Sequence, residues 1–190
     1  MTSVSIIGTG NMGQAIAGIL TKGGSTVEQI GHADTGTRVS GDIVVLAVPH
    51  AAVAEIVAQR GEELAGKVVV DITNPVNFQT FQLSPPADSS AAAELAAALP
   101  QSKVLKAFNT TFAPTLATGT VGTQPTTVLI AGDDTDSKNL LAEAISAGGV
   151  NAIDAGPLDR ARELEAIGYL QLTLAVGEKL PWTGGFAIVS

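Results

Sequence analysis

Apolar residues gather in short runs rich in Val, Ile and Leu, and these runs alternate along the chain with stretches rich in Ala and Leu. Short apolar, β-branched runs are typical of strands buried in a parallel sheet, and the longer stretches are typical of the helices that cover it. We predict strands at residues 4–7, 26–31, 42–48, 67–73, 104–109, 126–131 and 150–154. We predict helices at residues 12–22, 51–60, 90–99, 136–147 and 158–179. The alternation predicts a doubly wound α/β fold, in which a mostly parallel sheet lies between two layers of helices.

Three segments depart from this alternation. The second predicted strand reaches the third through HADTGTRVSG, which is near the minimum length for a crossover, so we expect a loop there rather than a full helix. The proline-containing segments 74–90 and 110–125 resemble linkers, but each follows the end of a predicted strand, where ligands bind in open α/β sheets. We interpret both as loops around a site, with residues 1–190 forming one domain.

Three glycines, Gly8, Gly10 and Gly13, follow the first predicted strand with the spacing GxGxxG. In a dinucleotide-binding loop the first permits a tight turn, the second lets a pyrophosphate approach the backbone, and the third lets the helix pack closely on the strand. The spacing alone is also compatible with a structural turn. Here it follows a strand pattern and opens a helix pattern, which favours cofactor binding in a Rossmann-type domain.

The end of the second predicted strand bears on the choice between NAD and NADP. An Asp or Glu at this point accepts hydrogen bonds from the adenosine ribose and repels a 2′-phosphate. This chain has Gly31 there, followed by His32 and, further on, Arg38, which favours NADP. Two alternatives stay open: Asp34 can still bind the ribose, and His32 and Arg38 can be ordinary solvated loop residues.

Composition excludes several functional classes. The formal net charge of −8 disfavours nucleic acid, whose binding needs clustered Lys and Arg. The chain has no cysteine and only two histidines, His32 and His50, so we expect no disulfide and no bound metal. No apolar run reaches the roughly 18 residues of a membrane span, and the start of the chain lacks the basic region of a signal peptide. We therefore expect a cytoplasmic protein without a membrane partner.

The sequence offers no clear proton donor for carbonyl reduction. The one tyrosine, Tyr169, is followed four residues later by Thr173 rather than by the lysine of short-chain dehydrogenases. His50 is the one candidate catalytic side chain, and it can equally be a helix N-terminal residue at the rim of the pocket. Hydride transfer to another conjugated ring mainly requires proximity and orientation, so a flavin-type acceptor suits such a site.

The predicted strand ends supply the walls of the site. Asn74 and Asn109 can bind the nicotinamide carboxamide or the edge of the acceptor ring, and both are also common turn residues. Phe108 can face a ring, although a core position is more typical of phenylalanine. The residues expected near the nicotinamide are Val48, Pro49, His50, Asn74, Pro75, Ala107, Phe108 and Asn109.

The segments IIGTGNMGQAI, VVLAVPH, VVVDITNP, KVLKAFNT and DAGPLDRARELEAI together resemble the NADP oxidoreductases dependent on coenzyme F420, a group related to the NADPH-binding domain of STEAP metalloreductases. The resemblance covers nearly the whole chain. It implies hydride transfer between NADP(H) and F420 or a flavin such as FMN or FAD. It also implies nicotinamide at the walls described above, and NADP held at the first turn by Thr9, Gly10, Asn11 and Met12. Where characterised members have Ser-Arg after the second-strand glycine, this chain has His32-Ala33.

Two other functions remain as alternatives: a non-catalytic dinucleotide-binding or redox-sensing module, and an imine reductase similar to pyrroline-5-carboxylate reductase. The apolar end WTGGFAIV favours a homodimer, by strand addition or packing, and packing within the subunit is the alternative. In the last predicted helix, the spacing of Arg160 to Glu163 and of Arg162 to Glu165 favours helix-stabilising contacts. The arginines, with Lys103 and Lys106, are also candidates to bind an anionic deazaflavin tail.

Overall fold

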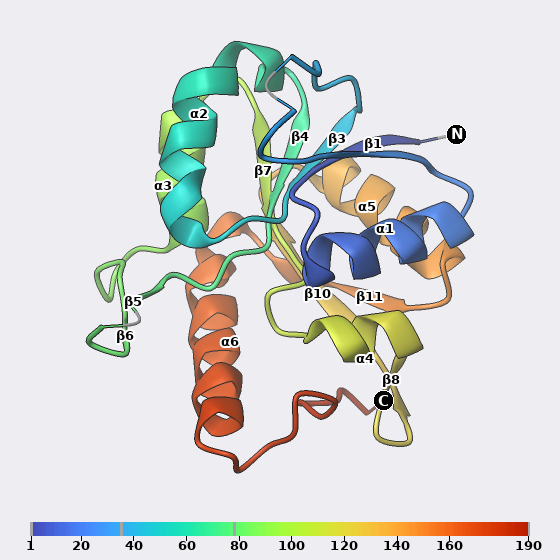
Figure 1. Cartoon of the computed structure of the whole chain (residues 1–190), viewed down its shortest axis with the longest axis vertical. Coiled ribbons are helices and arrows are strands. Elements are labelled where there is room, and N and C mark those ends of the chain that lie inside the picture. Colours follow the sequence, from blue (N-terminus) through green and yellow to red (C-terminus); the bar gives the residue numbers. More distant parts are fainter. Residues whose placement is uncertain (1, 35, 78, 190) are drawn as a thin grey trace.

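A seven-stranded sheet runs through the middle of the molecule, as the computed structural model in Figure 1 shows for residues 2–34, 36–77 and 79–189. Its strands lie in the spatial order β11-β10-β7-β4-β3-β1-β2. Their bounds are β1 Ser3–Ile7, β2 Thr26–Ile30, β3 Ile43–Leu46, β4 Val68–Asp71, β7 Lys103–Lys106, β10 Thr127–Gly132 and β11 Asn151–Gly156. The predicted doubly wound, Rossmann-type α/β fold is confirmed.

One strand reverses the direction of the sheet. The strands β2, β1, β3, β4 and β7 are mutually parallel. By contrast, β10 pairs antiparallel with β7 through only two residue pairs, Ala131 with Lys106 and Gly132 with Leu105. The last strand, β11, is again parallel to β10. The sheet is therefore mostly parallel, as predicted, and the carboxyl ends of β1, β3, β4 and β7 meet along one edge.

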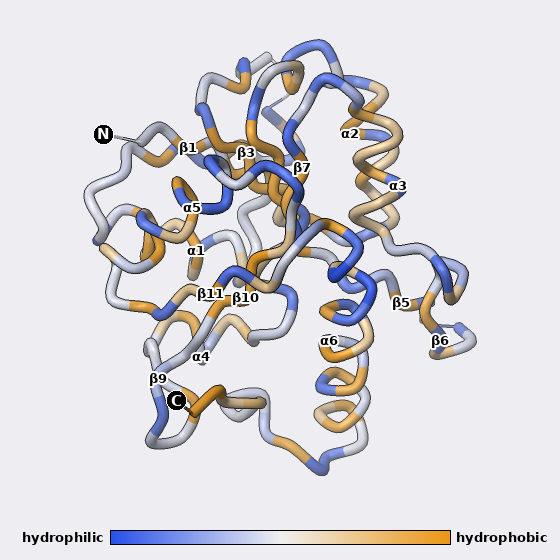
Figure 2. Tube along the Cα trace, turned by 180° about the vertical axis from the view of Figure 1, so that it is seen from behind, coloured by the Kyte–Doolittle hydropathy of each residue, from blue (hydrophilic) through white to orange (hydrophobic). Residues whose placement is uncertain are grey.

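Helices cover both faces of this sheet. In Figure 1, α1 (Asn11–Lys22) and α5 (Thr135–Ala147) lie on one face, and α2 (His50–Leu64) and α3 (Ala91–Ala98) lie on the other. Strand β3 shows why: Ile43 and Val45 belong to one buried apolar cluster, and Val44 and Leu46 belong to the second. Both faces of the strand need cover, which explains its continuous apolar run. Figure 2 shows this apolar centre along the trace.

The segments predicted as loops contain short elements that the sequence pattern did not indicate. Within 74–90, β5 (Val76–Asn77) and β6 (Gln82–Leu83) form a hairpin. Within 110–125, α4 (Ala113–Thr118) precedes a hairpin of β8 (Thr120–Val121) and β9 (Gln124–Pro125). The described residues between β2 and β3 contain no helix, in agreement with the predicted loop.

The last predicted helix, 158–179, is wrong at both ends. Its first turn, η1 (Leu158–Arg160), is a 3-10 turn capped by Pro157, and α6 (Ala161–Val176) ends at Gly177. In Figure 1, α6 runs away from the sheet and the chain then turns back toward β8. Among the helices of the described residues, none combines the length and the apolar character needed to cross a membrane.

Candidate functional site

The three glycines after β1 form a closely packed loop with one open side. Gly8 has a φ of +122°, and a Cβ built on it would lie 2.1 Å from the main-chain oxygen of Ala47. A Cβ on Gly13 would lie 2.4 Å from the oxygen of Gly8. A Cβ on Gly10, by contrast, would meet no atom within 4 Å. Gly8 and Gly13 are therefore required by packing, whereas the space in front of Gly10 is free for a ligand.

The N-terminus of α1 opens onto this space. Gly10 is its N-cap, no side chain caps the helix, and the first turn carries no acidic residue. The helix dipole and main-chain N–H groups therefore favour an anion at this point. An adjoining hollow of about 280 Å³ is lined by Ile7, Gly8, Thr9, Gly10, Ile30, Gly31, His32, Ala47, Val48, Pro49, Ala52, Glu55, Ile56, Gln59 and Arg60. We call this hollow the glycine-loop pocket. Its open cradle and lack of a competing carboxylate at the helix end fit a dinucleotide pyrophosphate.

The structure brings six of the predicted cofactor residues to the glycine-loop pocket, namely Gly8, Thr9, Gly10, His32, Val48 and Pro49. Asn11 is exposed at the start of α1, whereas Met12 packs against the core. Arg38 is exposed and lines a different hollow, with Val39, Glu62 and Glu63. Asp34 binds its own loop, because its Oδ2 accepts the N–H of Gly31 at 2.8 Å.

Arg60 lines the glycine-loop pocket although sequence reasoning did not select it. It lies near the end of α2, is 9% exposed, and reaches across to the loop that follows β2. In the sequence, an arginine on an amphipathic helix looks like an ordinary solvent-exposed residue. No local motif connects it with Gly31 or His32, so only the fold brings them to one hollow.

At the ends of β4 and β7, Asn74 and Asn109 bind each other. The Asn74 Nδ2 donates to the main-chain oxygen of Asn109 at 2.9 Å, and the Asn109 Nδ2 donates to the Asn74 Oδ1 at 3.0 Å. The Asn109 Nδ2 also donates to the oxygen of Leu164 at 2.8 Å, which ties the pair to α6. The two predicted asparagines thus form one amide pair at the carboxyl edge of the sheet.

Three buried polar atoms near this edge have no hydrogen-bond partner within the described residues. They are the Nδ1 of His50, the Oγ1 of Thr73 and the Oδ1 of Asn109. These residues follow the ends of β3, β4 and β7, three adjacent strands. Since buried polar groups are nearly always paired in folded proteins, unpaired ones at a strand-end edge fit a ligand with several hydrogen-bonding groups, such as a nicotinamide carboxamide.

The neighbouring predicted residues serve the backbone and the core. Phe108 is fully buried within the core and has a φ of +64°. Its conformation accompanies a tight turn in which the N–H of Asn109 donates to the oxygen of Ala107 at 2.8 Å. Pro49 is the N-cap of α2, so His50 is the first residue of that helix, and Pro75 is buried. The interpretation of Phe108 as a core residue is confirmed.

A buried ion network lies beside the amide pair. The Lys106 Nζ contacts the Asp71 Oδ2 at 2.8 Å, the Glu165 Oε1 at 2.8 Å and the main-chain oxygen of Thr73 at 2.6 Å. Lys106 is 0% exposed. Glu165 also accepts the N–H of Ala91 at 3.0 Å, at the start of α3. The network therefore joins β4, β7, α3 and α6.

This network corrects two sequence-based expectations. Lys106 cannot bind an anionic ligand tail, because it is fully buried and already paired with two carboxylates. The expected Arg162–Glu165 contact is also wrong, since Glu165 is buried and faces Lys106. The expected pair of Arg160 and Glu163 does form, at 3.7 Å.

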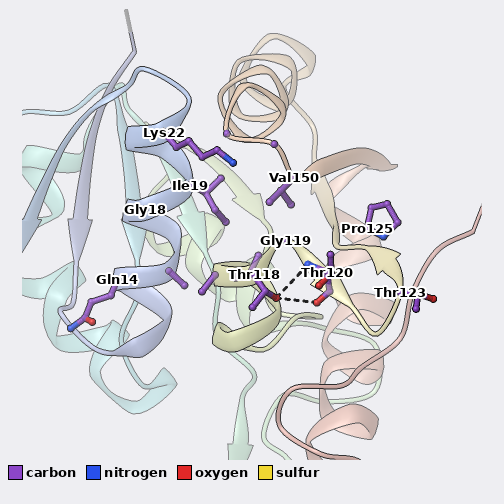
Figure 3. Close-up of a pocket in the computed structure, with 15 residues that line it drawn as sticks. Gln14, Gly18, Ile19, Lys22, Thr118, Gly119, Thr120, Thr123, Pro125 and Val150 are labelled. Atoms are coloured by element: carbon purple, nitrogen blue, oxygen red, sulfur yellow. Dashed lines mark hydrogen bonds between the residues drawn. The ribbon is translucent and has the colours of Figure 1, made fainter.

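A larger hollow of about 610 Å³ lies elsewhere, between α1, α4 and the β8–β9 hairpin (Figure 3). Its walls include Gln14, Lys22, Thr118 and Thr123, and the hydrogen bonds drawn there join Thr118 to Thr120 within the wall itself. None of the sequence-predicted site residues lines this hollow. The glycine-loop pocket and the strand-end edge, rather than this larger hollow, are the candidate site.

The doubly wound sheet and the open glycine loop define a dinucleotide-binding protein of the Rossmann type. The family model described as "NADP oxidoreductase coenzyme F420-dependent" matches residues 31–75. The F420-dependent NADP reductase of Methanocaldococcus jannaschii is 31% identical over 171 residues, which cover 87% of this chain and 76% of that protein. The chain belongs to this F420-dependent NADP oxidoreductase family and is an NADP-dependent oxidoreductase.

Two further similarities agree with this assignment. The metalloreductase STEAP3 of Rattus norvegicus is 38% identical over 106 residues, which cover 56% of this chain and 21% of that protein. A crystal structure from Arthrobacter sp. FB24, provisionally assigned as an F420-dependent NADP-reductase, superposes with a TM-score of 0.87 at 24% identity and covers both chains completely. At that identity the superposition supports the fold.

Proposed function

We propose that the protein transfers hydride between NADP(H) and a flavin-type ring, with the deazaflavin coenzyme F420 as the preferred acceptor class. When bound, NADPH supplies a hydride from its nicotinamide, the acceptor ring gains that hydride, and water supplies the proton that completes acceptor reduction. The observation that carries the proposal is the strand-end edge, where an amide pair lies beside unpaired polar atoms and the buried Lys106 is held by two carboxylates.

The residues divide into two groups in this proposal. Gly8, Thr9, Gly10, Asn11, Met12 and Gly13 hold the pyrophosphate and its flanking groups at the N-terminus of α1, and His32 lies at the adenosine end. Val48, Pro49, His50, Asn74, Pro75, Ala107, Phe108 and Asn109 form or support the nicotinamide wall. In this wall the Asn74–Asn109 pair orients the ring, because the two amides fix each other and Asn109 is also fixed to α6.

The available proton donors favour a ring acceptor over a carbonyl. The Tyr169 hydroxyl donates to the main-chain oxygen of Phe81 at 2.6 Å, and Lys106 is committed to its ion network. Among the described residues at this edge, His50 remains the candidate acid, with its Nδ1 buried and unpaired. Carbonyl reduction requires a proton at the acceptor oxygen as hydride arrives, whereas transfer between rings depends mainly on stacking distance.

Acceptor reduction tests this proposal directly. NADPH oxidation is followed by absorbance with F420, FMN and FAD in parallel, and Asn109→Leu is compared with Glu163→Gln on the exposed face of α6. We expect the wild type and Glu163→Gln to reduce F420 faster than FMN or FAD, and Asn109→Leu to lose most of this activity; faster reduction of FMN or FAD would contradict the preference for F420. NADPH binding without any acceptor reduction would instead support a non-catalytic module, and turnover with pyrroline-5-carboxylate would support an imine reductase.

We also propose that a second copy of the chain packs against α6. Residues 166–177 carry no charge, yet Ile167, Leu170 and Val176 are exposed, as are the tail residues Trp182, Phe186, Ile188 and Val189. The tail partly returns to its own subunit, where Trp182 contacts Phe112 at a ring-centroid distance of 5.0 Å, and it forms no strand. These exposed side chains form an apolar surface of the kind that marks protein interfaces, and a stable interface buries roughly 800 Å² on each partner.

The size of the particle in solution tests the dimer. Light scattering after gel filtration should give twice the chain mass for the wild type and a monomer for Leu170→Glu. Ile153→Glu is the matched comparison, because Ile153 is equally aliphatic and 41% exposed but lies on the edge strand β11. Dissociation by Ile153→Glu alone would place the interface at the sheet edge and refute packing through α6.

A further inference from the structure

We propose that Arg60 of α2 selects NADP over NAD, by holding the loop after β2 and presenting positive charge to the 2′-phosphate of the adenosine ribose. The proposal rests on the proposed binding of NADP(H) at the glycine-loop pocket. Arg60 lies on α2, whereas Arg38, the residue that the sequence pattern favoured, lies in the loop after β2.

Arg60 belongs to the same hollow as the glycine loop. This hollow extends from Gly8 and Gly10 to Gly31 and His32, and the face of α2 from Ala52 to Arg60 forms its far wall. When a pyrophosphate lies at the α1 N-terminus, the adenosine ribose lies toward the end of the second strand, as in other Rossmann domains. Arg60 is therefore on the side of the pocket where a ribose phosphate would be.

The bonds of Arg60 fix this part of the pocket. Its Nη1 donates to the main-chain oxygen of Thr37 at 2.7 Å, and its Nη2 donates to the oxygen of Asp34 at 3.0 Å. Glu63, one turn later, is 3.4 Å from Nη1 and accepts the N–H of Val39 at 2.8 Å. Two residues of α2 thus pin both halves of the loop, which makes the guanidinium a fixed group rather than a mobile surface charge.

The charges around the pocket favour Arg60 as the phosphate partner. The charged and titratable side chains that line it are Arg60, His32 and Glu55. His32 and Glu55 are exposed to solvent, whereas Arg60 is nine-tenths buried, so the field of Arg60 is screened least. An always-charged, planar guanidinium matches the geometry of a phosphate better than the other two groups do. Arg38 is exposed and lines a separate hollow, away from the glycine loop.

Two nucleotides that differ only by the 2′-phosphate provide the probe. The dissociation constants of adenosine 2′,5′-bisphosphate and 5′-AMP are measured by calorimetry for the wild type, Arg60→Met, Arg60→Lys, Arg38→Met and Lys67→Met. Lys67 is the matched control, because it also donates to loop carbonyls, to Gly41 at 2.7 Å and Ser40 at 3.4 Å, but does not line the pocket. Thermal melts check that each variant is folded.

We expect Arg60→Met to lose the preference for the bisphosphate by about tenfold or more, the effect of one lost charge-assisted hydrogen bond. Arg60→Lys should keep part of the preference, and Lys67→Met should keep all of it. Three results would each overturn the proposal. Arg60→Met could weaken the binding of both nucleotides equally, Arg60→Lys could lose as much of the preference for the bisphosphate as Arg60→Met does, or Arg38→Met could lose that preference. Hydride transfer can fail with every acceptor without changing this ratio, so the two proposals fail separately.

Discussion

Replacing Lys106 with methionine should destabilise the fold far more than any change to a surface ion pair. Lys106 is fully buried and its Nζ lies 2.8 Å from each of two carboxylates, on Asp71 and Glu165. Removing one partner of a buried ion pair costs about 3–5 kcal/mol, because it leaves uncompensated charge out of water. For a domain of this size, each kcal/mol corresponds to about 2–4 °C, so the melting temperature should fall by roughly 6–20 °C.

Because Lys106 is shared by two carboxylates, the variants of this network should lose stability in a defined order. Glu165→Gln leaves Lys106 paired with Asp71, so it should cost less than Lys106→Met, which leaves two carboxylates without their cation. Glu163→Gln is the surface control: its partner Arg160 is 3.7 Å away and exposed, and such pairs contribute at most about 1 kcal/mol. Thermal unfolding followed by circular dichroism measures all three. Equal melting temperatures for the Lys106→Met and Glu163→Gln proteins would refute the reasoning.

Two further predictions concern the glycine loop and acid stability. Gly10→Ala should fold normally, because its Cβ enters open space, but that Cβ occupies the ligand's space, so NADPH should bind about tenfold or more weakly in a titration. Gly8→Ala should lose about 2–5 kcal/mol of unfolding free energy in urea, because its Cβ would lie 2.1 Å from the Ala47 oxygen and its φ is positive. Burial alone would raise the pKa of Glu28, but hydrogen bonds from Ser5 and Ser40 lower it below its ordinary 4.5. A lowered pKa stabilises the fold above 4.5 and loses this effect as the pH falls, so the stability gap between wild type and Glu28→Gln should shrink in acid; a constant gap would contradict this.

The strands were predictable because burial on both faces leaves a continuous apolar run. Their ends were not. The run 42–48 extends past the last ladder residue, Leu46, and the run 104–109 extends past Lys106. Residues such as Phe108 leave the hydrogen-bonded ladder yet remain buried, because the chain turns into the core at the edge of the sheet. Apolar patterns report burial, whereas a strand is defined by its hydrogen bonds. At the edge of the sheet where the site lies, residues are buried without belonging to a strand, so the pattern overestimates the length of the strands.

The glycine loop and the positions of Asn74 and Asn109 could also be predicted, because the first is a local motif and the asparagines follow predictable strand ends, but their bonds to each other could not. The short helix α4 and the two hairpins could not, because two to six residues carry too little periodicity to identify an element. Arg60 was missed for a different reason. Its partners lie 23 and 26 residues earlier in the chain, and no sequence spacing reports a contact of that kind.

The buried network gives a structural role to three charged residues in the segments that carry the family resemblance. Asp71 belongs to DITNP, Lys106 to KAFNT and Glu165 to ARELE, and in the sequence each has the appearance of a solvated charge or a ligand contact. In the fold Asp71 and Glu165 both pair with Lys106, and Glu165 also fixes the start of α3. These segments therefore specify how β4, β7, α3 and α6 are joined beneath the amide pair. Since Asp71, Lys106 and Glu165 are buried and paired within this network, these three side chains cannot contact an acceptor, and the choice of acceptor depends on side chains outside the network.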